Sequence, residues 1–257
     1  MKLKIFMPTY RANAIVLKEN DCLKDDRLFN IYTKEKGKIQ IRITGGKKIK
    51  NKLAAHVQPF FEIDMLIAKG RSCDRVAGAR SAVNFSGIRN DLCKTAAACC
   101  LQEVVDKLCK IQVPDDRIYS LLFNYLKLIE DSRLKSWELE KLISFFSLKI
   151  LGFLGYRPWF EICVYCQKKV FGDKVYLLPA KGGIGCSRCV KDNDKHVTVN
   201  KKTAEILGLA YLENTDNLLR LKIEKNQSEE ISSVAKKFLE YQLEKPLLSF
   251  EFFRTCL

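Results

Sequence analysis

Histidine is scarce in this chain of 257 residues, which contains only His56 and His196. Only these two side chains could therefore serve in acid–base catalysis by histidine. The sequence also lacks the Gly-x-x-x-x-Gly-Lys-[Ser/Thr] phosphate loop, the Gly-x-Ser-x-Gly nucleophile turn and the His-Glu-x-x-His metal pair. The glycine-rich stretch TGGKK (44–48) is too short for a nucleotide-binding loop. These absences favour a protein that binds its partners over one that performs covalent chemistry.

Long apolar runs are absent as well. No stretch of about eighteen uncharged apolar residues occurs, so a membrane span is not predicted. The first residues, MKLKIFMPTYRANAIVL, place Lys4 among the apolar side chains and lack a cleavage site of small residues, so we predict no signal peptide. A composition of 47% hydrophobic and 29% charged residues is that of a globular protein. We expect a cytoplasmic protein that does not bind membranes.

Cysteine, by contrast, is plentiful, with eleven in the chain. In a reducing compartment these are not expected to form a disulfide framework. Cys93, Cys99, Cys100 and Cys109 fall in a region rich in alanine and leucine, where a thiol behaves as a small hydrophobic side chain. Outside the paired cluster described next, the cysteines are Cys22, Cys73, Cys93, Cys99, Cys100, Cys109 and Cys256.

Two Cys-x-x-Cys pairs stand nineteen residues apart, Cys163 with Cys166 and Cys186 with Cys189. This spacing is typical of a zinc site, in which four sulfurs surround the ion at about 2.3 Å. Glycines just before the second pair permit the tight backbone bends of such a site; they are Gly182, Gly183 and Gly185. The pattern predicts one structural Zn²⁺.

Two other interpretations of the cysteine pairs remain open. A thiol–disulfide role needs only one pair, and catalytic zinc needs an open coordination position with a partner base. His196 follows the second pair and could replace a cysteine, although a surface histidine is the simpler interpretation. Nearby cations could offset the thiolate charge or contact phosphate; they are Lys168, Lys169, Lys181 and Arg188.

Positive charge is concentrated near the N-terminus. Residues 1–80 hold 18 basic and 8 acidic side chains, a net of +10 out of +15 for the chain. Residues 201–257 hold 9 of each, so the excess is not a uniform surface property. Concentrated positive charge favours a polyanion through counterion release, so nucleic acid is the predicted ligand.

Short strands are predicted in the first third of the chain. KIQIRIT (38–44) alternates isoleucine with polar residues, as expected for a sheet with one buried face. Similar segments span 13–18, 27–33, 60–69 and 75–83, with glycines and a proline between them. Five strands in this length predict a small barrel, and an OB-fold, which commonly binds single strands, fits the count.

Helical periodicity begins after about residue 84. We predict helices at 91–109, 117–131, 136–156, 203–213 and 226–245. Asp91 suits the first turn of its helix, and Asn226 with Glu229 suggests a capping box for the last. The expected fold class is therefore α+β with several domains. These are an OB-fold domain (1–83), a helical domain in two parts (84–160 and 201–257) and an inserted zinc-binding module (161–200).

Four segments resemble those of a known family. They are GKIQIRITGGKKIKNKLAAHVQPFFEID (37–64), FSLKILGFLGYRPWFEICVYC (146–166), GGIGCSRC (182–189) and FLEYQLEKPLLSFEFF (238–253). In this order and spacing the sequence resembles the bacterial RecO recombination mediators over nearly its whole length. About eight residues at the N-terminus depart from the family's usual start.

The resemblance implies an OB-fold, a helical domain and a zinc module. It also implies a protein that binds single- and double-stranded DNA, anneals complementary strands and works with RecR. Together they would help RecA replace single-stranded-DNA-binding protein (SSB), whose acidic, aromatic-ended tail would dock on the helical domain. The expected location is then cytoplasmic, at the nucleoid during repair.

We predict a non-enzymatic mediator whose basic surface brings two polyanionic strands together. The expected phosphate contacts are Lys38, Arg42, Lys47, Lys48, Lys50 and Lys52, with Arg11, Arg71, Arg75 and Arg80 as weaker candidates. Two alternatives stay open, a zinc-containing enzyme that modifies nucleic acid and a redox-switched zinc chaperone.

Overall fold

A computed structural model describes residues 8–21, 25–131 and 133–256. These residues form two compact units, and the division falls directly after Asp131. The predicted helical range 84–160 therefore contributes helices to both units. Within the described ranges, no helix has both the length and the apolar character needed to cross a lipid bilayer.

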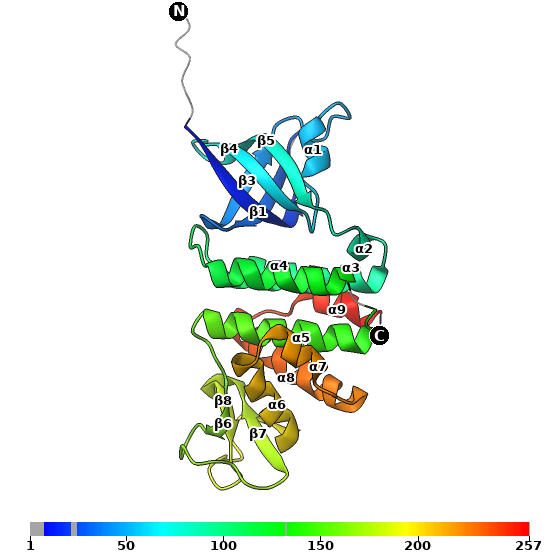
Figure 1. Ribbon diagram of the computed structural model, residues 1–257. Helices are drawn as coiled ribbons and strands as arrows, with labels where there is room; N and C mark the ends of the chain where they lie inside the picture. The colour runs from blue at the N-terminus through cyan, green and yellow to red at the C-terminus, as the bar shows by residue number, and fades with distance from the viewer. Residues whose placement is uncertain (1–7, 22–24, 132, 257) are drawn as a thin grey trace, which may run out of the picture. The chain divides into compact units, whose positions relative to one another are not determined.

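The described part of the first unit is built on five strands, of which β1, β3, β4 and β5 are labelled in Figure 1. They pair in the order β1-β2-β3-β5-β4, and β1 pairs with β4 so that the sheet closes into a barrel. Four of the five ladders are antiparallel, and the ladder between β3 and β5 is parallel. The strands are β1 (Thr9–Asn20), β2 (Arg27–Thr33), β3 (Gly37–Ile43), β4 (Glu62–Ala68) and β5 (Asp74–Val83).

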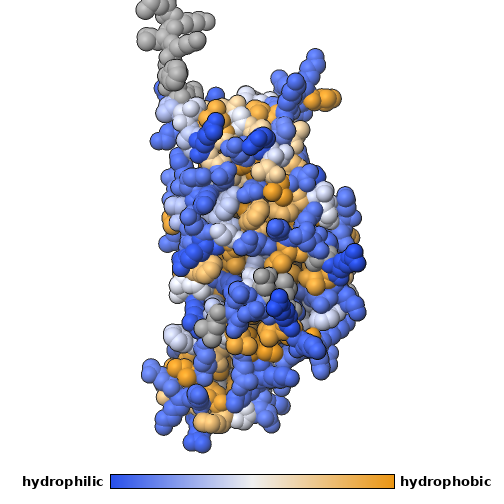
Figure 2. Space-filling model, in the orientation of Figure 1, coloured by the Kyte–Doolittle hydropathy of each residue, from blue (hydrophilic) through white to orange (hydrophobic). Residues whose placement is uncertain are grey.

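Alternation along the strands separates the barrel core from its outer face. In β3, Ile39, Ile41 and Ile43 are buried while Gln40 between them is exposed. The core that they join also contains Phe29 and Met65, both fully buried. Figure 2 shows one face of the molecule coloured by hydropathy. Hydrophilic side chains predominate on this face, and the hydrophobic areas are smaller. The predicted alternation of KIQIRIT is confirmed.

In the described part of the first unit, a short helix, α1 (Lys52–His56), follows β3, and three helices follow β5. The three are α2 (Ser86–Arg89), α3 (Leu92–Leu108) and α4 (Asp116–Asp131). Gln102 of α3 donates to the Val16 carbonyl at 2.6 Å, and Tyr119 of α4 donates to Glu62 at 2.9 Å. These buried or half-buried hydrogen bonds attach the helices to the barrel wall.

The second unit combines helices with a small sheet. Its helices are α5 (Ser136–Phe153), α6 (Lys201–Leu212), α7 (Thr215–Arg220), α8 (Lys225–Leu243) and α9 (Leu248–Arg254). Its sheet has the order β6-β8-β7-β9. The strands are β6 (Trp159–Cys163), β7 (Lys174–Leu178), β8 (Gly183–Gly185) and β9 (Val197–Asn200), with a 3-10 turn at Pro179–Lys181. An edge-to-face pair of Phe160 and Phe238, 5.7 Å apart, joins β6 to α8.

The five-stranded N-terminal sheet, the helical part and the cysteine cluster agree with the sequence predictions. One capping prediction is wrong, because α8 begins earlier than expected. Its N-cap is Glu224, whose side chain makes no capping hydrogen bond, so Asn226 already lies inside the helix. Asp91 is the N-cap of α3 itself, where its carboxylate accepts from Lys94 N at 2.9 Å.

Candidate metal centre and basic surface

Two parallel strands bring the cysteine pairs together. β6 and β8 are neighbours, with Trp159 opposite Gly183 and Cys163 opposite Ile184. β6 ends at Cys163, and Cys186 follows β8 directly. Because parallel neighbours end at the same edge of a sheet, both pairs emerge at one edge although nineteen residues separate them in sequence.

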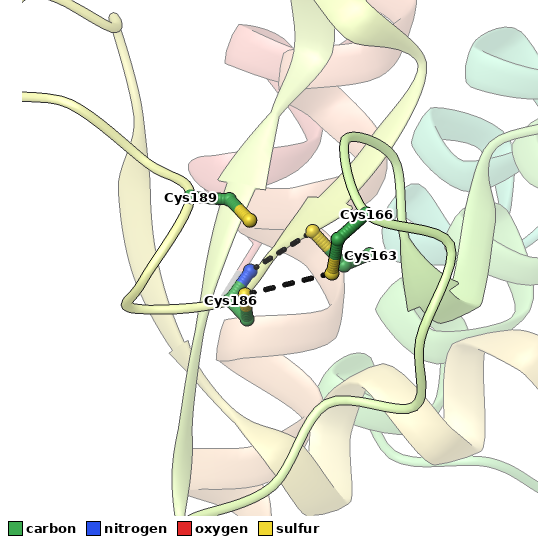
Figure 3. A group of neighbouring side chains, drawn as sticks. All are labelled: Cys163, Cys166, Cys186 and Cys189. Carbon is green, nitrogen blue, oxygen red and sulfur yellow. Dashed lines mark hydrogen bonds between the residues drawn. The ribbon is translucent and has the colours of Figure 1, made fainter.

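The four sulfur atoms face a common centre (Figure 3). All lie within 4.8 Å of one another, and Cys166 Sγ is 4.0 Å from Cys186 Sγ. A tetrahedral ion bonded to four sulfurs at about 2.3 Å holds them about 3.8 Å apart. Four soft donors in this arrangement fit a metal ion such as Zn²⁺, with all of its coordination positions taken by protein sulfur.

Backbone turns shape each pair of cysteines. In the first, Gln167 N donates to the Cys163 carbonyl at 2.8 Å and Gln167 adopts a left-handed φ of 58°. In the second, Cys189 N and Val190 N both donate to the Cys186 carbonyl, at 3.0 and 3.1 Å. Such turns let both sulfurs of a pair point the same way.

The predicted role of the glycines is corrected in part. Gly182 alone of the three bends the chain through a left-handed φ, of 69°. Gly183 and Gly185 lie in β8, where they allow close approach. A Cβ on Gly183 would be 2.5 Å from the Trp159 carbonyl oxygen, and one on Gly185 would be 2.4 Å from a Val190 methyl.

The thiols influence one another's ionisation. Burial raises the pKa of Cys163, but hydrogen bonds from the backbone N–H groups of Cys166, Cys186 and Tyr165 outweigh it and lower the pKa to about 6. The pKa of Cys189 is raised, chiefly by its hydrogen bond with the Cys186 thiol and then by burial. Four clustered thiols cannot all ionise side by side without a cation, which supports the fit of this donor set to a metal.

Among the described residues, the other cysteines and the two histidines do not belong to this cluster. Cys100 and Cys109 are buried, and burial is the main cause of a Cys109 pKa of about 12. Cys22 lies outside the described residues. His196 stacks edge-on against Tyr176 at 4.9 Å, and its Nδ1 lies 2.8 Å from the Asp194 carbonyl oxygen. Among the described residues it is not one of the clustered metal donors.

A loop braced by hydrogen bonds leads from β3 into α1, and with Lys52, the first residue of α1, it carries four of the predicted DNA contacts. All four are exposed; they are Lys47, Lys48, Lys50 and Lys52. Gly45 N donates to Asp26 at 2.8 Å, Lys47 N to the Asp25 carbonyl at 2.8 Å and Asn51 N to the Lys48 carbonyl at 2.9 Å. Asn51 also caps α1, accepting from Leu53 N and Ala54 N. The loop therefore presents its lysines from a defined backbone.

The other predicted contacts lie on the barrel strands and their connections. Arg42 of β3 lies opposite Arg75 of β5 across the parallel ladder, and Arg42 is 3.9 Å from Asp26. Arg80 is 3.9 Å from Asp64 with its side chain 82% exposed. Arg11 and Arg71 are exposed as well. Thus Arg42 and Arg75 adjoin, whereas the others are spread over the barrel.

Lys38 differs from the rest of the predicted set. Its ammonium donates to the Asp106 carbonyl oxygen and lies 3.8 Å from the Asp106 carboxylate, with only 13% of its side chain exposed. This arrangement makes Lys38 a link between β3 and α3. One exposed residue was overlooked in the sequence, Ile49, which is fully exposed between the loop lysines. The sequence signal that could have identified Ile49 is its position as an apolar residue between Lys48 and Lys50.

Comparison with known proteins places this architecture in a family. The chain matches two family models, one described as "Recombination protein O N terminal" over residues 7–85 and one as "Recombination protein O C terminal" over residues 89–251. The chain belongs to the RecO family. RecO proteins are DNA repair and recombination proteins, and the resemblance found in the sequence is confirmed.

Individual RecO relatives match along almost their entire length. The DNA repair protein RecO of Desulforamulus reducens is 30% identical over 246 residues, covering 96% of this chain and 94% of its own. The protein of the same name from Pelotomaculum thermopropionicum has the same identity and coverage. That of Dehalococcoides mccartyi is 24% identical, covering 92% and 91%. Both units of the chain are thus represented in its relatives.

Proposed function

We propose that this RecO-family protein is a recombination mediator that binds single- and double-stranded DNA and anneals complementary strands. The observation that carries the proposal is the braced basic loop on the closed five-stranded barrel of a RecO-family chain. Five-stranded barrels of the OB type bind single strands with a groove of positive charge and with side chains against the bases. We assign the barrel domain, residues 1–83, to this class.

Lysines of the loop would contact phosphate, together with Arg42 and Arg75. Lys47, Lys50 and Lys52 are exposed, and Lys48 keeps a side chain 66% exposed despite its pairing with Asp25 at 3.3 Å. Exposed pairs of this kind contribute little stability, so Lys48 can exchange its partner for a phosphate. Lys38 is the weakest member of the set, because Asp106 already holds its ammonium.

The cysteine cluster would hold one structural Zn²⁺. Cys163, Cys166, Cys186 and Cys189 would be the ligands, and four protein sulfurs leave no position for a reacting water. The ion would tie the ends of β6 and β8 together and so stabilise the module of residues 161–200. We therefore propose that the protein works without covalent catalysis.

The protein's partners would be those of the RecO pathway. With RecR it would help RecA replace SSB on single-stranded DNA, and the acidic tail of SSB would dock on the helical domain. Proteins that carry high positive charge approach a polyanion quickly, which suits a role in bringing two DNA strands together.

The decisive experiment measures annealing of complementary strands precoated with the cognate SSB, with and without this protein. We expect the full-length protein to accelerate annealing, and the variant with Lys47, Lys48, Lys50 and Lys52 replaced by alanine to accelerate it much less. Equal rates with and without the protein would refute the mediator role. A turnover assay on labelled nucleic acid in the same samples would reveal a zinc enzyme instead.

A further inference from the structure

The second unit contains an aromatic cleft. It has a volume of about 290 Å³ and is formed by residues of α5, β6, the 3-10 turn and α8. Three of its aromatic side chains are half exposed: Tyr156 at 50%, Trp159 at 52% and Tyr241 at 54%. Large aromatic side chains normally bury most of their surface, so three together on one cleft indicate a binding surface.

The charge of this cleft is of one sign. Arg157 and Lys181 line it, and no carboxylate does among the described residues. Four other cavities of the described chain are each lined by at least one aspartate or glutamate. A ligand with negative charge and flat apolar faces would therefore be complementary to this cleft.

Arg157 of the cleft packs against two aromatic rings of the protein. Its guanidinium carbon lies 5.5 Å from the Trp159 ring centre and 4.9 Å from that of Tyr211. Glu161 accepts from Arg157 Nη2 at 2.7 Å, which fixes the guanidinium in place. Trp159 is thus supported from within by a cation, while half of its surface stays available to a ligand.

Open space at two glycines keeps the cleft accessible. Gly155 and Gly182 both line it, with φ of 86° and 69°, and a Cβ on either would meet nothing within 4 Å. The adjoining Lys181 is exposed. A phosphate beside Lys181 could therefore lie next to a base in contact with the ring of Trp159.

We propose that this cleft binds unpaired nucleotides of single-stranded DNA, by stacking a base on Trp159 and pairing its phosphate with Lys181. The inference rests on the proposed DNA binding of the chain and adds a second contact surface in the other unit. Stacking of bases on aromatic side chains is independent of sequence and excludes bases already paired in a duplex. The cleft would therefore discriminate single strands from double strands.

A single-tryptophan variant tests the cleft directly. The chain has two tryptophans, so Trp137→Phe leaves Trp159 as the sole one. Binding of a labelled oligothymidylate is followed by anisotropy, and Trp159 emission is recorded in parallel. We expect oligothymidylate to quench Trp159, and an abasic strand of equal length to leave its emission nearly unchanged at saturation.

The outcomes separate this inference from the proposed function. DNA binding without any response of Trp159, or equal quenching by the abasic strand, would overturn the cleft as a base site and leave the DNA-binding role intact. No DNA binding at all would overturn both. Quenching by an acidic or proline-rich peptide but not by DNA would likewise contradict the assignment and indicate a protein partner.

Substitution gives a second test with a matched control. Trp159→Ala combined with Tyr241→Ala should weaken single-strand affinity about tenfold and change double-strand affinity less than about twofold. Phe171→Ala is the control, since Phe171 is an aromatic of the same module, 82% exposed, that lines a different cavity. Equal losses in the two variants, or equal losses for both DNA forms, would contradict the proposal.

Discussion

Cys163 is the most buried of the four clustered thiols, and it receives hydrogen bonds from the backbone. Serine at this position keeps the size of the side chain but supplies a hard oxygen donor in place of a thiolate. We expect Cys163→Ser to lose the bound metal and to lower the free energy of unfolding by about 4 kcal/mol or more. Metal content per chain and thermal unfolding measure the two effects.

Cys256→Ser is the matched control for this prediction, because Cys256 lies outside the cluster. It should retain the full metal content. A Cys163→Ser protein that keeps its metal, or that loses the metal without loss of stability, would show that the cluster does not stabilise the module. DNA binding should fall only as a consequence of unfolding.

Glu140 of α5 is a carboxylate in an unfavourable environment. Burial raises its pKa, against the opposing effects of a hydrogen bond from Ser232 and the charges of Arg254 and Lys225. Because the folded pKa lies above the unfolded value, this group favours folding only at low pH, and the contribution is lost as pH rises through the folded pKa. Glu140→Gln should therefore raise the thermal midpoint at pH 7 and leave it nearly unchanged below about pH 4.

Glu251→Gln is the comparison, because the pKa of Glu251 is shifted in the opposite direction to that of Glu140. The carboxylate of Glu251 accepts from Lys236, and this lowers its pKa. Removing its charge should leave the midpoint unchanged or slightly lower at pH 7. A Glu140→Gln protein with a lower midpoint at pH 7 would show that the attraction of Arg254 and Lys225 outweighs the cost of burial.

At the scale of elements, the metal centre depends on how closely β6 and β8 approach. Gly183→Ala would place a methyl group 2.5 Å from the Trp159 carbonyl oxygen, so the strands would have to separate. We expect a loss of about 1–3 kcal/mol in unfolding free energy, together with weaker retention of metal against a chelator. Calorimetry and chelator competition measure these effects.

Gly208→Ala is the matched control, since a Cβ there meets its nearest neighbour at 3.8 Å, an ordinary contact. It lies within α6 and should stabilise the protein by about 0.5–1 kcal/mol. If both substitutions weaken metal retention equally, the close approach of β6 and β8 is not what positions the cysteine pairs.

Periodic elements could be predicted from the sequence, and short or tertiary ones could not. The alternation in KIQIRIT led directly to β3, because one face of each strand is buried in the barrel. The helix α1 was missed, since its five residues are too few to show a helical period. The cysteine spacing revealed the cluster, but the cleft around Trp159 joins residues of β6 and α8 that no local pattern connects.

The same distinction applies to the predicted DNA contacts. Charge counts identified the basic region, because net charge is a property of composition. They could not separate Lys38, which faces Asp106, from Lys50, which is exposed, since both are lysines near glycines in basic surroundings. Lys38 differs from Lys50 only because α3 packs on the barrel and brings Asp106 to the Lys38 ammonium.

For the whole molecule, the uneven charge predicts how DNA binding responds to salt. Replacing four loop lysines by alanine removes up to four phosphate contacts, so the slope of log affinity against log salt should become shallower by about 3 for single-stranded DNA. The replaced residues are Lys47, Lys48, Lys50 and Lys52. Anisotropy titrations at several salt concentrations measure the slope.

A control with equal change in net charge tests whether position matters. Four lysines of the charge-balanced C-terminal quarter serve this purpose, namely Lys202, Lys222, Lys225 and Lys237. Their replacement should leave the slope nearly unchanged. An unaltered slope in the loop variant, or the same change in both variants, would refute the loop as the main phosphate contact.

The way in which the barrel closes has a consequence for self-association. The parallel ladder pairs Ile41 with Asp74 and Arg42 with Arg75, whereas β5 continues to Val83. α1 lies against β5, and His56 Nδ1 is 3.4 Å from Ser81 Oγ. A strand edge without cover is a template for pairing with another chain, and so for aggregation. The small helix that follows the basic loop covers part of this edge of β5, so loosening the helix would expose strand backbone that could pair with another chain.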